Sequence, residues 1–93
     1  IIMFYISGFY KFKKINDIKK SKKLLIEIFK KYQIRGTIII SVEGINGTIS
    51  SNKKNLNLVL KKIKSIFKFT NFDSQNLSKN KFQIFHKGKV KIK

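Results

Sequence analysis

The sequence predicts an α+β fold, and two observations carry that prediction. Segments rich in β-branched and aromatic residues are interleaved with two segments in which apolar residues recur at helical spacing. The chain has 93 residues, of which 42% are hydrophobic and 13% aromatic, which is enough apolar material for one core and too short for two domains. We therefore expect a single domain over residues 1–93.

The first strand and the first helix are predicted from the opening third of the chain. Residues 1–12 are almost continuously β-branched or aromatic, which is typical of a strand that is central in a sheet or covered on both faces. Within it, Ser7-Gly8 suggests a bulge. Asp17 is a good N-cap, and the apolar residues after it recur at helical spacing, so we expect an amphipathic helix over residues 18–33.

A β-hairpin is predicted next. Residues 37–42 and 47–51 both have strand character, and the residues between them favour a turn. A four-residue loop would place Ile40 opposite Ile49 on one face of the hairpin. A two-residue turn at 46–47 is the alternative, but it would leave only a very short third strand, so we prefer the longer loop.

The second helix and the last strand complete the order of elements. Ser51 or Asn52 can cap a helix whose apolar residues recur at helical spacing over residues 56–67. After a polar stretch, residues 82–92 alternate, and His86 falls on the apolar side of that alternation, as expected for a half-buried strand histidine. The opposite side of this strand carries a row of lysines: Lys87, Lys89, Lys91 and Lys93.

The resulting order, β-α-β-β-α-β, is that of a ferredoxin-like domain. In this architecture two helices cover one face of a four-stranded antiparallel sheet, with the first and third strands central and the second and fourth at the edges. The lysine row would then protect an edge strand against pairing with another chain. The opposite face of the sheet is left open, with Ile39 and Phe85 projecting from it, and such an apolar face needs a partner.

Composition narrows the function further. The chain has 22 basic and 4 acidic residues, giving a formal charge of +18, which excludes an acidic scaffold and favours a polyanionic partner. Drift of the gene toward A- and T-rich codons is an equally good explanation of the charge taken alone. If RNA is the partner, we expect these basic residues to contact its phosphates: Lys11, Lys13, Lys14, Arg35, Lys61 and Lys62.

Catalytic and metal chemistry find little support in the sequence. The chain has no cysteine and a single histidine, so disulfides, thiolate nucleophiles and Cys/His zinc sites are excluded. The four acidic residues are scattered and form no obvious catalytic pair. We therefore expect no catalytic residue, no metal site and no cofactor in this chain.

The most unusual local motif lies in the predicted hairpin. Its two glycines and its asparagine can adopt positive φ, so their amides could cup an anion, although a plain turn that needs those backbone angles is the simpler interpretation. The motif consists of Glu43, Gly44, Ile45, Asn46, Gly47 and Thr48.

Residues 36–50, which contain this motif, resemble the rhodanese-domain tRNA wobble-uridine hydroxylases. In that family an N-terminal ferredoxin-like, or acylphosphatase-like, domain carries Gly-Thr-Ile, then Glu-Gly-Ile-Asn-Gly-Thr, with an aromatic-aromatic-Lys-Phe segment near its first strand. Phe9-Tyr10-Lys11-Phe12 occupies that place here. The resemblance covers about residues 9–69 and weakens over residues 71–93.

The resemblance implies a role for the chain within a larger enzyme. The parent protein would convert the wobble uridine of tRNA to 5-hydroxyuridine with molecular oxygen, using a cysteine of a rhodanese domain that this chain lacks. The chain would then be a non-catalytic N-terminal domain that positions tRNA and docks onto the rhodanese domain. The implied partners are tRNA and the rhodanese domain, with no membrane partner, and the implied location is the cytoplasm.

Three alternatives stay open. A stand-alone acylphosphatase would share the fold, but it requires a glycine-rich phosphate loop with an arginine after the first strand, and residues 6–11 contain no arginine. A basic RNA-binding domain without any link to catalysis is the second alternative. The third is a membrane-surface role for the basic amphipathic helix at residues 56–68, whose apolar stripe is, however, what the core of the domain needs.

Overall fold

The computed structural model describes residues 3–93, and it confirms the predicted order of elements as far as the second helix. The predicted first strand includes Ile1 and Ile2, which lie outside the described residues. The elements are β1 (Phe4–Phe12), α1 (Ile18–Lys31), β2 (Arg35–Ser41), β3 (Gly44–Ser51), α2 (Lys53–Ile66), β4 (Ser74–Gln75), β5 (Ser78–Asn80) and β6 (Gly88–Ile92).

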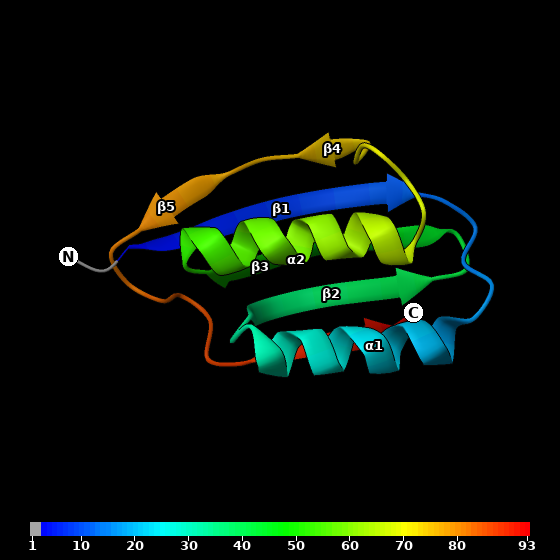
Figure 1. Ribbon diagram of the computed structural model, residues 1–93, viewed down its shortest axis with the longest axis horizontal. Coiled ribbons are helices and arrows are strands. Elements are labelled where there is room, and N and C mark those ends of the chain that lie inside the picture. The colour runs from blue at the N-terminus through cyan, green and yellow to red at the C-terminus, as the bar shows by residue number, and fades with distance from the viewer. Residues whose placement is uncertain (1–2) are drawn as a thin grey trace.

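The ferredoxin-like fold class is confirmed, with more strands than predicted. The sheet has six strands in the order β4-β1-β3-β2-β6, and β5 also pairs with β1. Figure 1 shows α1 and α2 running side by side across one face of this sheet. The first and third strands are central, as predicted, whereas β2 is not an edge strand because β6 pairs with it.

Side-chain caps and an apolar interface explain why the two helices form where they do. The carboxylate of Asp17 accepts a hydrogen bond from the backbone N–H of Lys20 at 3.1 Å, and the Asn52 side chain accepts one from Asn55 at 2.8 Å. Both predicted N-caps are therefore confirmed. Between the helices and the sheet, Leu25, Leu56, Ile63, Ile38 and Ile49 are completely buried, and each such side chain contributes about 1.5–3 kcal/mol of hydrophobic stabilisation.

The pairing of β1 with β3 is continuous. It runs from Tyr5 opposite Ser51 to Phe12 opposite Gly44 without an extra residue on either strand. The predicted bulge at Ser7-Gly8 is therefore wrong. Gly8 instead lies where the side chain of Asn76 packs against β1, and its N–H donates to Asn76 Oδ1 at 3.0 Å.

The hairpin between β2 and β3 has a tighter turn than predicted. Ser41 pairs with Gly44, so only Val42 and Glu43 form the turn, and Ile40 lies opposite Ile45 rather than Ile49. Both predicted loops were wrong because Gly44 already belongs to β3. It has a φ of +151°, and a Cβ there would collide with the carbonyl oxygen of Lys11 on β1.

The last third of the chain differs most from the prediction. The polar stretch before residue 81 forms β4 and β5, which occupy the free edge of β1, so the final strand cannot pair there. Residues 81–87 are irregular, and β6 pairs with β2 in parallel at the opposite edge. His86 is exposed in the irregular segment, so the prediction of a half-buried strand histidine was wrong. The lysine row does follow an edge strand, as predicted, but at the other edge.

Candidate nucleic-acid interface

The face of the sheet opposite the helices is the candidate site, and we call it the open face. Because side chains alternate along a strand, the neighbours of the core residues point to this face. Its side chains come from four strands and the residue that follows the last of them: Tyr10 and Phe12 of β1, Thr37, Ile39 and Ser41 of β2, Asn46 and Thr48 of β3, Lys89 and Lys91 of β6, and Lys93 directly after β6.

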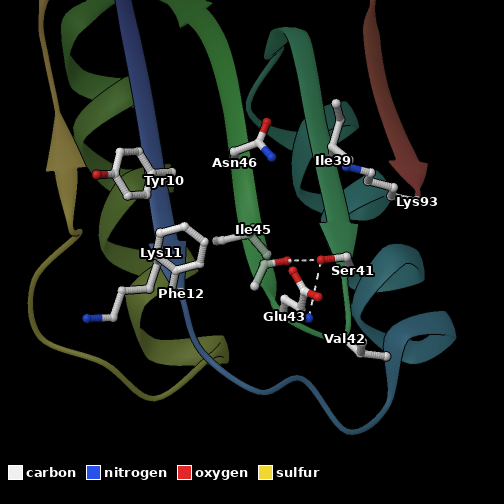
Figure 2. Close-up of a pocket in the computed structure, with 11 residues that line it drawn as sticks. Tyr10, Lys11, Phe12, Ile39, Ser41, Val42, Glu43, Ile45, Asn46 and Lys93 are labelled. Atoms are coloured by element: carbon white, nitrogen blue, oxygen red, sulfur yellow. Dashed lines mark hydrogen bonds between the residues drawn. The ribbon is translucent and has the colours of Figure 1, made fainter.

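A pocket of about 620 Å³ lies on the open face beside the hairpin turn, and we call it the hairpin pocket. Figure 2 shows Tyr10 and Phe12 of β1 on one side of it and Lys93 on the other, with Asn46 between them. The two aromatic side chains are 42% and 72% exposed, respectively. Large aromatic groups left this accessible on one pocket wall are typical of a binding surface.

A second pocket, of about 430 Å³, continues the first along the strands. The two pockets share Tyr10, Ile39 and Asn46, so they form one shallow depression that we call the open-face trough. Phe85, from the irregular segment before β6, lines the second pocket together with Ile39. Both residues were predicted to project from this face.

The electrostatics of the open face are almost entirely basic. Lys89, Lys91 and Lys93 alternate with Val90 and Ile92, so all three point to the open face while Val90 is buried under α1. Among residues 3–93, Glu43 is the only acidic residue that lines the trough. The other acidic residues are occupied elsewhere: Asp17 caps α1, Glu27 lies on α1, and Asp73 pairs with Lys11.

Lys11 is the predicted phosphate contact that the structure places most unexpectedly. Its side chain lies on the helix side of β1, with Nζ 5.3 Å from the Phe69 ring centroid and 3.4 Å from Asp73 Oδ1. The backbone N–H of Phe12 donates to the Asp73 carboxylate at 2.7 Å, and this hydrogen bond, aided by Lys11, lowers the Asp73 pKa. Lys11 therefore already has an anionic partner within the chain.

The other predicted phosphate contacts do not form one surface. Lys13 and Lys14 follow β1 near the hairpin turn, where the Lys13 N–H donates to the Glu43 carbonyl at 2.9 Å. Arg35 begins β2 at the opposite end of the sheet, and its guanidinium donates to the Phe85 carbonyl at 3.4 Å. Lys61 and Lys62 lie on α2, on the other side of the sheet from the open face.

The six-residue motif from Glu43 to Thr48 is mostly strand. Its amides from Gly44 onward belong to β3, which is paired with β1 and β2 on its two sides, so they do not cup an anion. Gly47 has no room for a side chain, because a Cβ there would come within 2.5 Å of the Thr37 carbonyl oxygen. Ile45 is in the core, whereas Asn46 and Thr48 are exposed on the open face.

Sequence reasoning missed the grouping of the β6 lysines with the exposed aromatic residues. The lysine row was predicted to protect an edge strand, with no link to the aromatic residues of the first strand. Phe9 is buried, whereas Tyr10 and Phe12 lie on the opposite side of that strand. The alternation of both strands was visible in the sequence; the pairing of β6 with β2, which brings them to one face, was not.

Other kinds of site receive no support from the described part of the chain. No three His, Cys, Asp or Glu side chains gather there closely enough to hold a metal ion. The apolar stripe of α2, which a membrane-surface role would need, is buried through Leu56, Val59, Leu60 and Ile63. Within residues 3–93, neither helix has the length and apolar character needed to cross a membrane.

Comparison with known proteins identifies the family. The model of the UPF0176 acylphosphatase-like domain matches residues 4–93. The chain belongs to this family. It is 56% identical over 91 residues to the tRNA uridine(34) hydroxylase of Pelagibacter ubique, covering 98% of the chain but 30% of that protein. A further tRNA uridine(34) hydroxylase, from Wigglesworthia glossinidia brevipalpis, is 43% identical over 87 residues, covering 92% of the chain and 28% of that protein.

These relatives confirm the resemblance stated from the sequence, and they show that the full-length proteins contain further sequence beyond the matched region. Among solved structures, the acylphosphatase of Coxiella burnetii superposes with a TM-score of 0.60 at 4% identity, covering 97% of the chain and 92% of that protein. This likeness establishes the fold alone.

Proposed function

We propose that this chain is a non-catalytic module that binds tRNA and positions it for hydroxylation of the wobble uridine by another part of the same protein. The observation that carries the proposal is the 56% identity to a tRNA uridine(34) hydroxylase of which the chain spans 30%. The reactive cysteine expected of a rhodanese domain has no counterpart in this cysteine-free chain. The proposed partners are therefore tRNA and the rhodanese domain, and the proposed reaction is the oxygen-dependent formation of 5-hydroxyuridine.

The charge of the chain supports the binding half of this proposal. A formal charge of +18 on 93 residues attracts a polyanion strongly, and counterion release makes such binding dependent on salt. The position of the modified uridine in the anticodon loop favours contact with unpaired nucleotides. If about five phosphates of such a loop are engaged, the slope of log affinity against log salt should be about −3.5.

The test is a salt titration of the affinity between the 93-residue chain and a tRNA substrate. Salt-dependent binding with a slope near the expected value supports the proposal. A flat response to salt, or no binding at low salt, overturns it. A full-length hydroxylase relative with and without this domain then tests the positioning role, because removal of the domain should raise the KM for tRNA.

A stand-alone acylphosphatase is disfavoured by the structure as well as by the sequence. Residues 6–11, where the family resemblance would require a phosphate loop, lie inside β1 and are paired with β3 throughout. The segment between β1 and α1, residues 13–17, contains neither glycine nor arginine. We expect no turnover of an acyl phosphate, and measurable hydrolysis by the purified chain would contradict this.

A further inference from the structure

We propose that the open-face trough is the RNA-binding surface and that it recognises unpaired nucleotides, with bases stacked on Tyr10 and Phe12 and phosphates held by the lysines of β6. This inference rests on the proposed function, which leaves open both the surface of the domain that meets the RNA and the feature of the RNA that is recognised.

The aromatic side of the trough has the properties of a stacking platform. Tyr10 and Phe12 occupy successive outward positions of β1, and their ring centroids are 5.3 Å apart at an interplanar angle of 65°. With 42% and 72% of their surfaces exposed, they contribute little to the core. Exposed aromatic rings on a sheet are how many single-strand binding domains hold bases, because every base has a face that can stack.

The lysine side of the trough is suited to a phosphate backbone. Lys89 and Lys91 are alternate residues of β6, and Lys93 follows the strand directly, with its N–H donating to the Ile40 carbonyl of β2. Their side chains therefore leave the same face about 6.6 Å apart. Only β2 and β3 separate β6 from β1, which places the lysine row roughly 14 Å from the aromatic rings at the usual strand spacing. Long lysine side chains narrow that distance further, so a few nucleotides of single strand could span it.

The floor between the two sides contains a group able to read a base edge. Asn46 lies in both pockets of the trough, and its side chain is exposed. Within residues 3–93, its amide makes no hydrogen bond to another residue, so both its donor and its acceptor are available. An amide that presents a donor and an acceptor together can pair with the edge of an unpaired base.

Charge and shape together favour unpaired RNA over a protein or a duplex. Glu43 is the only acidic residue that lines the trough within residues 3–93, Lys93 also lines it, and Lys89 and Lys91 lie beside it on the open face. The complement of this surface is therefore an anion. The faces of bases in a duplex are already stacked on one another and unavailable to Tyr10 and Phe12. A duplex would meet only the lysines, and a neighbouring domain would have to be acidic and to cover the aromatic rings.

The test compares RNA affinities of the 93-residue chain with matched variants on the two sides of the sheet. The probes are a single-stranded oligouridine and a paired RNA hairpin of equal length. Tyr10→Leu and Phe12→Leu remove the stacking surface, and Tyr10→Phe retains it. The variant Lys89→Gln/Lys91→Gln/Lys93→Gln, which we call the trough lysine variant, removes three charges from the open face at and beside the trough. Its counterpart on the helices, Lys54→Gln/Lys61→Gln/Lys62→Gln, removes the same number from exposed positions of α2 and tests the phosphate contacts predicted at Lys61 and Lys62.

The proposal predicts a specific pattern. Each aromatic-to-leucine change lowers single-strand affinity at least about fivefold, whereas Tyr10→Phe and paired RNA show little change. The trough lysine variant makes the salt slope less steep by about 2, and the α2 variant leaves it nearly unchanged. Circular dichroism checks that all variants fold.

Other results overturn the proposal in distinguishable ways. If only the α2 variant weakens binding, RNA lies on the helices, and the proposed function survives without this inference. If the trough variants keep their RNA affinity but impair a full-length relative, the open face docks another domain. If the unaltered chain binds neither probe nor tRNA, the proposed function itself fails.

Discussion

On the helix-covered face of the sheet, β1, β2 and β3 present Phe9, Ile38 and Ile49, which are between 0% and 5% exposed. One residue along the same strands, Tyr10, Ile39 and Thr48 stay half-buried or exposed on the open face. The strand period of two therefore gives a single set of strands two chemically different surfaces. The helix-covered face is buried within the chain, whereas the open face leaves Tyr10 and Phe12 exposed.

The largest expected effect separates the two faces by stability. Leu56→Ala removes a completely buried side chain between α2 and the sheet, and it should lower the free energy of unfolding by about 2–5 kcal/mol. Phe12→Ala, on the open face, is the matched control and should change it by no more than about 0.5 kcal/mol. Urea denaturation measures both. A loss at Phe12 equal to that at Leu56 would contradict the distinction between the faces.

A smaller effect concerns how the helix layer is held in place. Asn52→Ala removes the side-chain cap of α2 and should cost about 1 kcal/mol of stability, whereas Asn52→Asp should retain most of it. Thermal denaturation measures the two variants. The NMR signals of Tyr10 should not shift in either one, since the open face does not touch α2; a clear shift there would show that the faces are coupled.

The smallest effect lies at the edge of β1, where Asp73 accepts from the Phe12 N–H and pairs with Lys11. Because this contact lowers the folded-state pKa of Asp73 below 3.8, its contribution to stability is fully present above that unfolded value. The contribution is lost as the pH falls through the folded-state pKa. Asp73→Asn should therefore lower the melting temperature slightly at neutral pH and have no effect in strong acid.

Melting temperatures of the unaltered chain and the Asp73→Asn variant across that range provide the check. If the difference in melting temperature between the two proteins grows as the pH falls, the Asp73 pKa is not lowered by folding. Removing Lys11 instead should give a weaker effect, because the backbone hydrogen bond from Phe12 is the main cause of the shift.

The helix-covered face could be predicted from the sequence because its signals are local. Asp17 and Asn52 cap helices through residues three positions away, and the apolar stripe of α2 is set by helical spacing. The hairpin turn was misplaced because the need for glycine at position 44 comes from the Lys11 carbonyl on a distant strand. From the hairpin sequence alone, a glycine that is required by contact with another strand cannot be told from a glycine that is required by a turn.

The open face was harder to predict because it is assembled from segments distant in sequence. Alternation indicated which side of its own strand each of Tyr10 and Lys91 would take. It did not indicate that β6 would pair with β2. The edge of β1, where the last strand was expected, is occupied by a polar stretch that has no strand pattern in its sequence. Asn76 fixes that edge through paired hydrogen bonds with Gly8, which depend on the tertiary structure.

The position of β4, β5 and β6 at the two edges of the sheet also affects how the domain opens. All three come from the last twenty residues, whereas β3 lies at the centre with a partner on each side. Local unfolding begins where few buried contacts oppose it, so the short strands at the β1 edge should release their amide protons to solvent long before β3 does. The amide protons of the central strand, which comes from the first half of the sequence up to its middle, should thus exchange slowly. Those of the edge strands, which come from the end of the sequence, should exchange rapidly.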